Sequence, residues 1–208
     1  MIRTTARFGL AVVALLTFSG CAFGTRTTRL TWPPAGEHLA AEPPGPAPSV
    51  WVAPVVDQRP EPRSLVGAVR NLLGMHTADV VTPDDVSGWA SAIITDELRR
   101  AGVRVVPRGA GVPEVGAELR RVHGEAYFVY SAEVELRAWL RLAETVPLNR
   151  DVRVEVKGDT NWVGAGEGYG LAISQAMKEA ARQVAQGVAA AFGPPAATPT
   201  QAPAAPGS

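Results

Sequence analysis

The chain has 208 residues, with 20 basic and 20 acidic side chains and a formal net charge of zero. This length suits one ordinary domain and argues against two, while the balanced charge argues against nucleic-acid binding, which needs a concentrated basic face. Gly and Pro are frequent, at 21 and 18 residues, whereas aromatic residues make up only 6%. The core must therefore depend on Val, Leu and Ala, with long irregular stretches around it.

The first 20 residues follow the order of a secretory signal peptide. A charged start, MIRTTAR, precedes the apolar run FGLAVVALLTF and the small residues Ser19 and Gly20. The run has about eleven residues, whereas a membrane span needs about 20. We therefore predict a lipoprotein signal peptide over 1–20, with a retained signal anchor as the alternative. Its removal takes away Arg3 and Arg7 and leaves 18 basic and 20 acidic residues.

Cys21 follows this segment directly and is the only cysteine, so it has no disulfide partner within the chain. Phe18-Ser19-Gly20-Cys21 resembles the lipobox of bacterial lipoproteins, although Phe18 replaces the usual Leu. The resemblance implies cleavage before Cys21 and acylation of its thiol, for example with palmitate. Several acyl chains, at about 0.8 kcal/mol per buried methylene, make a stable anchor. Ala22, in place of Asp, implies the outer membrane and a position facing the periplasm.

Both ends of the remaining chain are predicted to lack a core of their own. Residues 21–49 are rich in Pro, Gly, Thr and Ala, which predicts an extended tether that holds the domain off the bilayer. Within it, Leu30-Thr31-Trp32 is predicted as a short strand or a loose contact, and the alternative places Trp32 at the membrane interface. Residues 193–208 form a Pro/Ala-rich sequence without periodicity, which predicts a disordered tail. A single α+β domain is left at 50–192.

The first half of this domain begins with residues 50–56 (VWVAPVV), which are apolar on both faces and predict a central strand covered on each side. Residues 64–81 allow two interpretations, a short helix or a β-hairpin that returns through TADVV. Gly67 and Gly74 favour extended or turning backbone, so we predict strand and loop there.

A helix is predicted next. Thr82-Pro83-Asp84-Asp85 is typical of a helix start, with Thr82 as the cap and Pro83 at the first position. Apolar residues follow at helical spacing up to Ala101, and Gly102 ends the helix.

The second half of the domain alternates strongly. Short strands are predicted at 103–106 and 115–122, and residues 126–142 alternate apolar and polar side chains, which is typical of an antiparallel strand with one wet face. A partner strand follows through 152–156. The last helix is predicted at about 168–192. The elements together predict a two-layer α/β sandwich of the α+β class, a mixed, largely antiparallel sheet with two amphipathic helices packed on one face.

The sequence matches known catalytic, metal-binding and phosphate-binding motifs only weakly. His38, His76 and His123 lie far apart and match no metal-binding spacing, so we expect no metal, cofactor or catalytic residues. The glycine-rich run from Gly164 to Gly170 lacks the Lys-Ser/Thr of a phosphate-binding loop, which favours a flexible connector over a phosphate site. Beside Trp162, this connector is a candidate partner-binding loop; its candidate residues are Trp162, Gly164, Gly166 and Tyr169.

Asp57-Gln58-Arg59 follows the first predicted strand. Arg59 could recognise a carboxylate group of a ligand. A simpler interpretation is structural, with Asp57 capping a turn and Arg59 pairing with a local acid. We predict the structural role.

The order of these features is similar to that of the YajG-like family of uncharacterised bacterial lipoproteins. The resemblance rests on the lipobox, VAPVVDQRPE, the pattern Arg70-Asn71-x-x-Gly74, the helix DDVSGWASAIITDELRRAGVRVV, the long alternating strand and the C-terminal helix. It covers nearly all of residues 21–192. It implies an exported domain with an acylated Cys21 and supplies no catalytic residues or cofactor.

The sequence thus leads to two functional hypotheses. The first is a lipid-anchored, non-enzymatic cell-envelope lipoprotein that binds or helps to assemble an envelope partner through a sheet edge or the 162–169 loop. The second is a small-ligand or lipid-binding auxiliary of an envelope transport system. An apolar pocket of several hundred Å³ would favour the second, and a solid core with an exposed apolar edge would favour the first.

Overall fold

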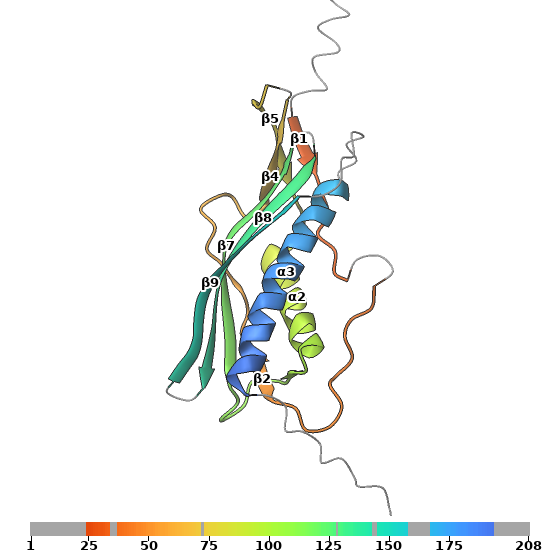
Figure 1. Ribbon diagram of the computed structural model, residues 1–208. Coiled ribbons are helices and arrows are strands. Elements are labelled where there is room, and N and C mark those ends of the chain that lie inside the picture. The colour runs from red at the N-terminus through yellow and green to blue at the C-terminus, as the bar shows by residue number, and fades with distance from the viewer. Residues whose placement is uncertain are drawn as a thin grey trace, which may run out of the picture.

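The computed structural model describes residues 24–33, 37–71, 73–127, 129–142, 145–157 and 167–193. Within these ranges the fold is the predicted α+β sandwich, a nine-stranded mixed sheet with two helices on one face (Figure 1). The predicted signal peptide, Cys21 and residues 194–208 of the predicted tail lie outside the described ranges. No described helix combines the length and apolar character that a membrane span requires.

Three long antiparallel strands form the body of the sheet: β7 (Glu114–Ala126), β8 (Tyr130–Leu142) and β9 (Thr145–Lys157). The predicted alternation is confirmed in β8, where every second side chain from Tyr130 to Leu140 is buried. A register shift between Leu119 and Arg121 inserts one extra residue into β7. This β-bulge shifts by one residue which side chains of β7 face the helices, so that Leu119 and Val122 are both buried.

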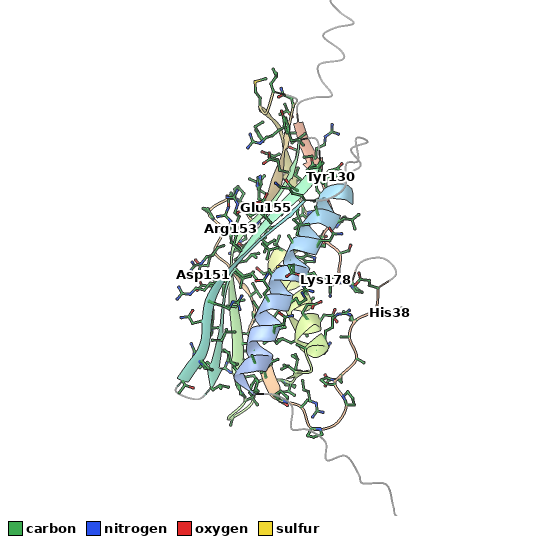
Figure 2. The ribbon with its side chains drawn as sticks, viewed as in Figure 1. His38, Tyr130, Asp151, Arg153, Glu155 and Lys178 are labelled. Atoms are coloured by element: carbon green, nitrogen blue, oxygen red, sulfur yellow. The ribbon has the colours of Figure 1, made fainter. Side chains whose placement is uncertain are left out.

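The outer face of these strands is wet, as the alternation predicts. Cross-strand ion pairs join Arg121 to Glu133, Glu133 to Arg153, and Arg153 to Glu135. Figure 2 shows Arg153, with Asp151 and Glu155, on the side of the sheet away from the helices. Alternating signs on neighbouring strands favour this register over shifted ones, because like charges placed opposite each other repel.

The sheet forks at the other edge of β7. The first half of β7 pairs in parallel with β2 (Ser49–Val52) and β3 (Val56–Asp57), and β6 (Arg104–Val105) lies beyond β2. We call β2, β3 and β6 the lower wing. The second half of β7 pairs with β4 (Leu65–Arg70), followed by β5 (His76–Val81) and β1 (Gly24–Thr27). We call β4, β5 and β1 the upper wing.

Two of the predicted elements, at 64–81 and 50–56, lie in the strands that form this fork. The hairpin interpretation of residues 64–81 is confirmed by β4 and β5. The single strand predicted at 50–56 is wrong, because it is divided into β2 and β3 at Pro54. Ala53 still donates its N–H to the carbonyl of Val115, whereas proline has no N–H to continue the ladder.

The predicted tether over 21–49 is wrong for residues 24–30, which belong to the fold. β1 pairs with β5, Thr28 donates its N–H to Val81, and Leu30 is buried. Asp84 accepts the N–H of Leu30 at 2.7 Å. Composition excludes a separate core in this segment, but it does not stop the backbone from pairing with a sheet edge whose N–H and C=O groups lack partners.

The helices α2 (Val86–Arg100) and α3 (Glu167–Ala191) pack on each other and on the same sheet face (Figure 1). The start of α2 differs from the prediction, because the N-cap is Asp85, whose carboxylate accepts the N–H of Ser87 at 3.1 Å. Thr82 accepts instead the N–H of Asp84, in a turn before the helix. The predicted end is confirmed, since Gly102 has a left-handed φ of 79°.

The pairing of β4 with β7 depends on Gly67, which lies opposite Gly124. A Cβ atom at position 67 would overlap the carbonyl oxygen of Gly124, which is backbone and cannot rotate away. We expect Gly67→Ala to lower the free energy of unfolding by about 1–3 kcal/mol or more, measured by urea denaturation. Gly109→Ala is the control, since a Cβ atom there makes only an ordinary contact with Val112. Equal stability of the two variants would contradict this role of Gly67 in the pairing of β4 with β7.

Candidate functional site

The predicted candidate residues fall in two groups. Cys21, Trp162, Gly164 and Gly166 lie outside the described residues. Tyr169 lies in the first turn of α3 and is only 5% exposed. Its ring packs edge-on against Tyr130 at 4.9 Å between centroids, and burial, with the neighbouring Tyr130, raises the pKa of its hydroxyl to about 12. The ring of Tyr169 therefore belongs to the core, where it holds the start of α3 against β8.

The three histidines are separated in the structure as in the sequence. Within the described ranges, no group of three or more His, Cys, Asp or Glu side chains is placed to hold a metal ion. His76 lies 3.0 Å from Asp79 on the same strand. Burial and the neighbouring Arg121 lower the pKa of His123, although Glu125 opposes this shift.

Arg59 closes the fork between the two wings. Its guanidinium donates to both carboxylate oxygens of Asp57, at 2.9 and 2.8 Å, and to the carbonyls of Leu65 and Arg63, each at 2.7 Å. Asp57 ends β3 and Leu65 begins β4, so one buried side chain joins the lower wing to the upper wing. Asp57 also accepts the N–H of Arg59 across a turn. The predicted structural role of both residues is confirmed.

Burial alone would raise the pKa of the Asp57 carboxyl, but the hydrogen bonds and the charge of Arg59 outweigh it, and the pKa is lowered. The carboxylate is therefore ionised at neutral pH, and the side chains of Asp57 and Arg59 are 7% and 1% exposed. This buried pair makes its hydrogen bonds within the fold, as the structural interpretation predicts.

The candidate site is a groove of about 620 Å³ where α2 meets the outer edge of the lower wing. One wall is a stripe of α2 residues at helical spacing, Ser91, Thr95 and Arg99, with Ala92 beside them. The rest of the wall comes from Leu39, Trp51, Val52, Ala53, Pro54, Val105, Val106 and Pro107. The surface is mostly apolar, and the groove is open along its length.

The floor of the groove ends at an edge strand. Within the described residues β6 is the last strand of the lower wing, and Arg104 and Val106 donate their N–H groups to the carbonyls of Pro48 and Val50. Because successive residues of a strand point their backbone groups to opposite sides, the N–H and C=O of Val105 face away from β2. An extended chain lying in the groove would therefore meet both apolar side chains and the outward-facing backbone of an edge strand.

A segment of the predicted tether forms the rim. Residues 37–45 are held against the helices: Arg100 donates to the carbonyl of His38 at 3.0 Å, the carboxylate of Asp96 accepts the N–H of Ala40, and Glu42 pairs with Arg99 and Arg104. Figure 2 shows His38 on this helix side of the molecule. These contacts place Leu39 over the groove with 53% of its surface exposed.

The polar side chains that line the groove are Ser91, Thr95 and Arg99. Ser91 already accepts the N–H of Val55 at 3.2 Å, and Thr95 and Arg99 can donate hydrogen bonds but cannot act as general bases. Arg108 lies 5.1 Å from the ring of Trp51 at one end, which leaves a cation beside an aromatic face. The lining of the groove is thus mainly apolar, with hydrogen-bonding groups contributed by α2.

Sequence reasoning missed this groove because its residues come from four separate segments. One signal was present: VWVAPVV is apolar on both faces, which predicted a strand covered on both sides. In the structure Trp51 and Val52 are only half-buried, since the lower wing ends one strand beyond them.

The fold thus defines a two-layer α+β sandwich with an apolar groove beside the edge strand of its described sheet. No protein-family model and no curated protein matches the sequence. Among solved structures, the chain is similar to an uncharacterized protein at 11% identity, covering 79% of this chain and 97% of that chain, with a TM-score of 0.49.

Two further structures are similar at comparable levels. A Xanthomonas campestris protein of the DUF330 family has 17% identity, coverage of 79% and 90%, and a TM-score of 0.47. A PelC dodecamer from Paraburkholderia phytofirmans has 12% identity, coverage of 69% and 92%, and a TM-score of 0.39. Similarities of this size assign neither a family nor a function to the chain.

The Arg59 clamp gives a direct test of the fork. Arg59→Met leaves the Asp57 carboxylate buried without its partner, so we expect the free energy of unfolding to fall by about 3–5 kcal/mol in urea denaturation. Arg120→Met is the matched control, because Arg120 makes longer, exposed ion pairs with Glu118 and Asp151. Its loss should cost about 1 kcal/mol at most. A similar, small effect of both substitutions would remove Arg59 from its role at the fork.

Proposed function

We propose that this protein is a lipid-anchored lipoprotein of the cell envelope that binds an envelope protein through the groove between α2 and the lower wing. In this proposal it is a member of the YajG-like family, is acylated at Cys21, and carries out no catalysis. The signal-peptide pattern and lipobox of residues 1–21 support the anchor. The outer membrane, with the domain facing the periplasm, is the proposed location because Ala22 and not Asp follows Cys21.

The observation that carries the binding role is the combination of an apolar groove with β6, the edge strand of the lower wing in the described part of the chain. An extended peptide can add to such an edge through backbone hydrogen bonds while its side chains fill apolar pockets. The groove is open, which favours an extended polypeptide that enters at one end and leaves at the other. A small molecule would have to be enclosed, and the open shape disfavours it. Arg108, beside the ring of Trp51, favours a segment with an acidic residue beside its apolar ones.

The alternative function is binding of a small apolar ligand or a lipid for an envelope transport system. The volume of about 620 Å³ favours it, since small-molecule pockets have about 300–1,000 Å³. The openness of the groove disfavours it, because such pockets usually bury most of the ligand surface.

The anchor is tested at Cys21. We expect Cys21→Ser to abolish metabolic labelling with palmitate and to release or misprocess the protein, because serine has no thiol to accept the lipid. Detection is by labelling and by membrane fractionation of intact cells. A processed Cys21→Ser protein that stays in the membrane fraction would disprove the lipid anchor.

The groove is tested by filling it. Ala92→Phe places a ring on the α2 wall, and Gln175→Phe, on an exposed position of α3 away from the groove, is the matched control. With a photo-crosslinking amino acid at Leu39, we expect one protein adduct in intact cells, lost in Ala92→Phe and kept in Gln175→Phe. The adduct is identified by mass spectrometry. A co-purifying lipid that Ala92→Phe displaces, without any protein adduct, would instead establish the alternative function.

A further inference from the structure

The tip of the β4–β5 hairpin exposes large apolar side chains. Leu73 is 81% exposed and Met75 is 56% exposed, and Tyr127, in the neighbouring β7–β8 connection, is 42% exposed. Half of the six large apolar side chains that are exposed in the described part of the chain therefore lie at one end of the sheet. Apolar side chains gathered in this way usually mark a surface that another phase or partner covers.

The tip is held in place by its own hydrogen bonds. The side-chain oxygen of Asn71 accepts the N–H groups of Leu73 and Met75, each at 3.0 Å, and Arg70 donates to the carbonyl of Gly74 at 2.9 Å. Asn71 and Met75 also pair through their backbones, and Gly74 supplies the left-handed φ of 77° that closes the turn. The loop therefore presents Leu73 in a fixed position.

The charge of Arg70, beside the tip, is paired within the protein. Arg70 lies 2.7 Å from Glu125, and the imidazole of His76 lies 3.0 Å from the carboxylate of Asp79. A surface that covered Leu73 and Met75 would not need to supply counter-ions for Arg70 and Glu125. This arrangement suits contact with an apolar phase better than contact with a strongly charged one.

Strand register places the start of the described chain beside this tip. Gly24 is opposite Ala78, Ala78 is opposite Val69, and Val69 is opposite Ala126, which in turn faces Tyr130. β1 and β5 are parallel, and β5 runs away from the tip. The chain that precedes Gly24 therefore joins the sheet from the tip side, and Figure 1 shows the start of β1 and the β4–β5 turn at the same end of the molecule.

Covalent geometry then limits how far Cys21 can lie from the tip. Cys21 is three residues before Gly24, and three residues span at most about 10–11 Å. Leu73 lies in the turn between Asn71 and Met75, and Asn71 is two residues, about 7 Å, past the same row of residues. A lipid on Cys21 and the side chain of Leu73 are therefore confined to the same end of the sheet.

We propose that the β4–β5 tip is a second membrane contact, in which Leu73 and Met75 insert into the surface of the bilayer that holds the acyl chains of Cys21. This inference rests on the proposed lipid anchor and adds an orientation to it: the upper wing faces the bilayer. The depth expected for such a contact is that of interfacial apolar groups, about 5–10 Å into the headgroup and acyl boundary.

The test uses the full-length acylated protein, purified in detergent and reconstituted into vesicles of phosphatidylethanolamine and phosphatidylglycerol. A polarity-sensitive NBD fluorophore is attached to a cysteine at position 73 (Leu73→Cys). Val56→Cys is the matched control, because Val56 is also an exposed apolar residue, at 47%, but lies in the lower wing. Intact mass gives the acylation state of Cys21 in the same samples.

We expect the label at 73 to shift to the blue on reconstitution and to lose emission when the vesicles contain brominated lipid, while the label at 56 does neither. A label at 73 that stays in water on an acylated protein overturns the inference and leaves the anchor intact. A blue shift without quenching by brominated lipid also overturns it, because a protein surface then covers the tip. Quenching on a protein without acyl groups supports the tip contact and removes the proposed anchor.

Discussion

The buried pair of Arg59 and Asp57 is the interaction on which the arrangement of the sheet depends. β7 has two sets of neighbours on one edge, and the connection between them must cross from β3 to β4 without leaving backbone carbonyls unpaired. Arg59 solves this by binding the Asp57 carboxylate and the carbonyls of Arg63 and Leu65 at once. A lysine could not replace it, because the planar fork of a guanidinium spreads its donors over several acceptors. Once this point is fixed, the two wings can carry different surfaces.

Those surfaces lie at opposite ends of the molecule. The upper wing ends in the apolar tip beside the start of β1, and the lower wing ends in the groove beside α2. The pairing of Trp51 with Glu114 and of Val69 with Ala126 places them at the two ends of β7. Thirteen residues of β-strand span about 40 Å. α3 packs along β7, β8 and β9 between these ends and buries residues at helical spacing from Tyr169 to Val188 (Figure 1).

Sequence alone predicted the parts of this fold whose signal is local and repeated. β8 and the two helices alternate or repeat over 13 residues or more, so their period identified them. β1 could not be found in this way, because all four of its residues are exposed and its pairing with β5 joins segments that lie far apart in the sequence. The cap of α2 was misassigned because Thr82, Asp84 and Asp85 can all cap a helix, and Asp84 is used instead by Leu30, 54 residues away. The groove required Leu39, Trp51, Thr95 and Val105 to meet, which no local pattern records.

The short connection between Cys21 and β1 changes what the groove can reach. With a long flexible tether, the groove could approach the bilayer and collect lipids directly. With only two residues between the proposed anchor and the sheet, the groove stands about 40 Å from the tip, well outside the bilayer. A lipid would have to leave the membrane completely to occupy it, at a cost of about 0.8 kcal/mol for each methylene exposed on the way. A protein segment in the aqueous space has no such barrier, which is a physical reason to prefer a polypeptide as the occupant of the groove.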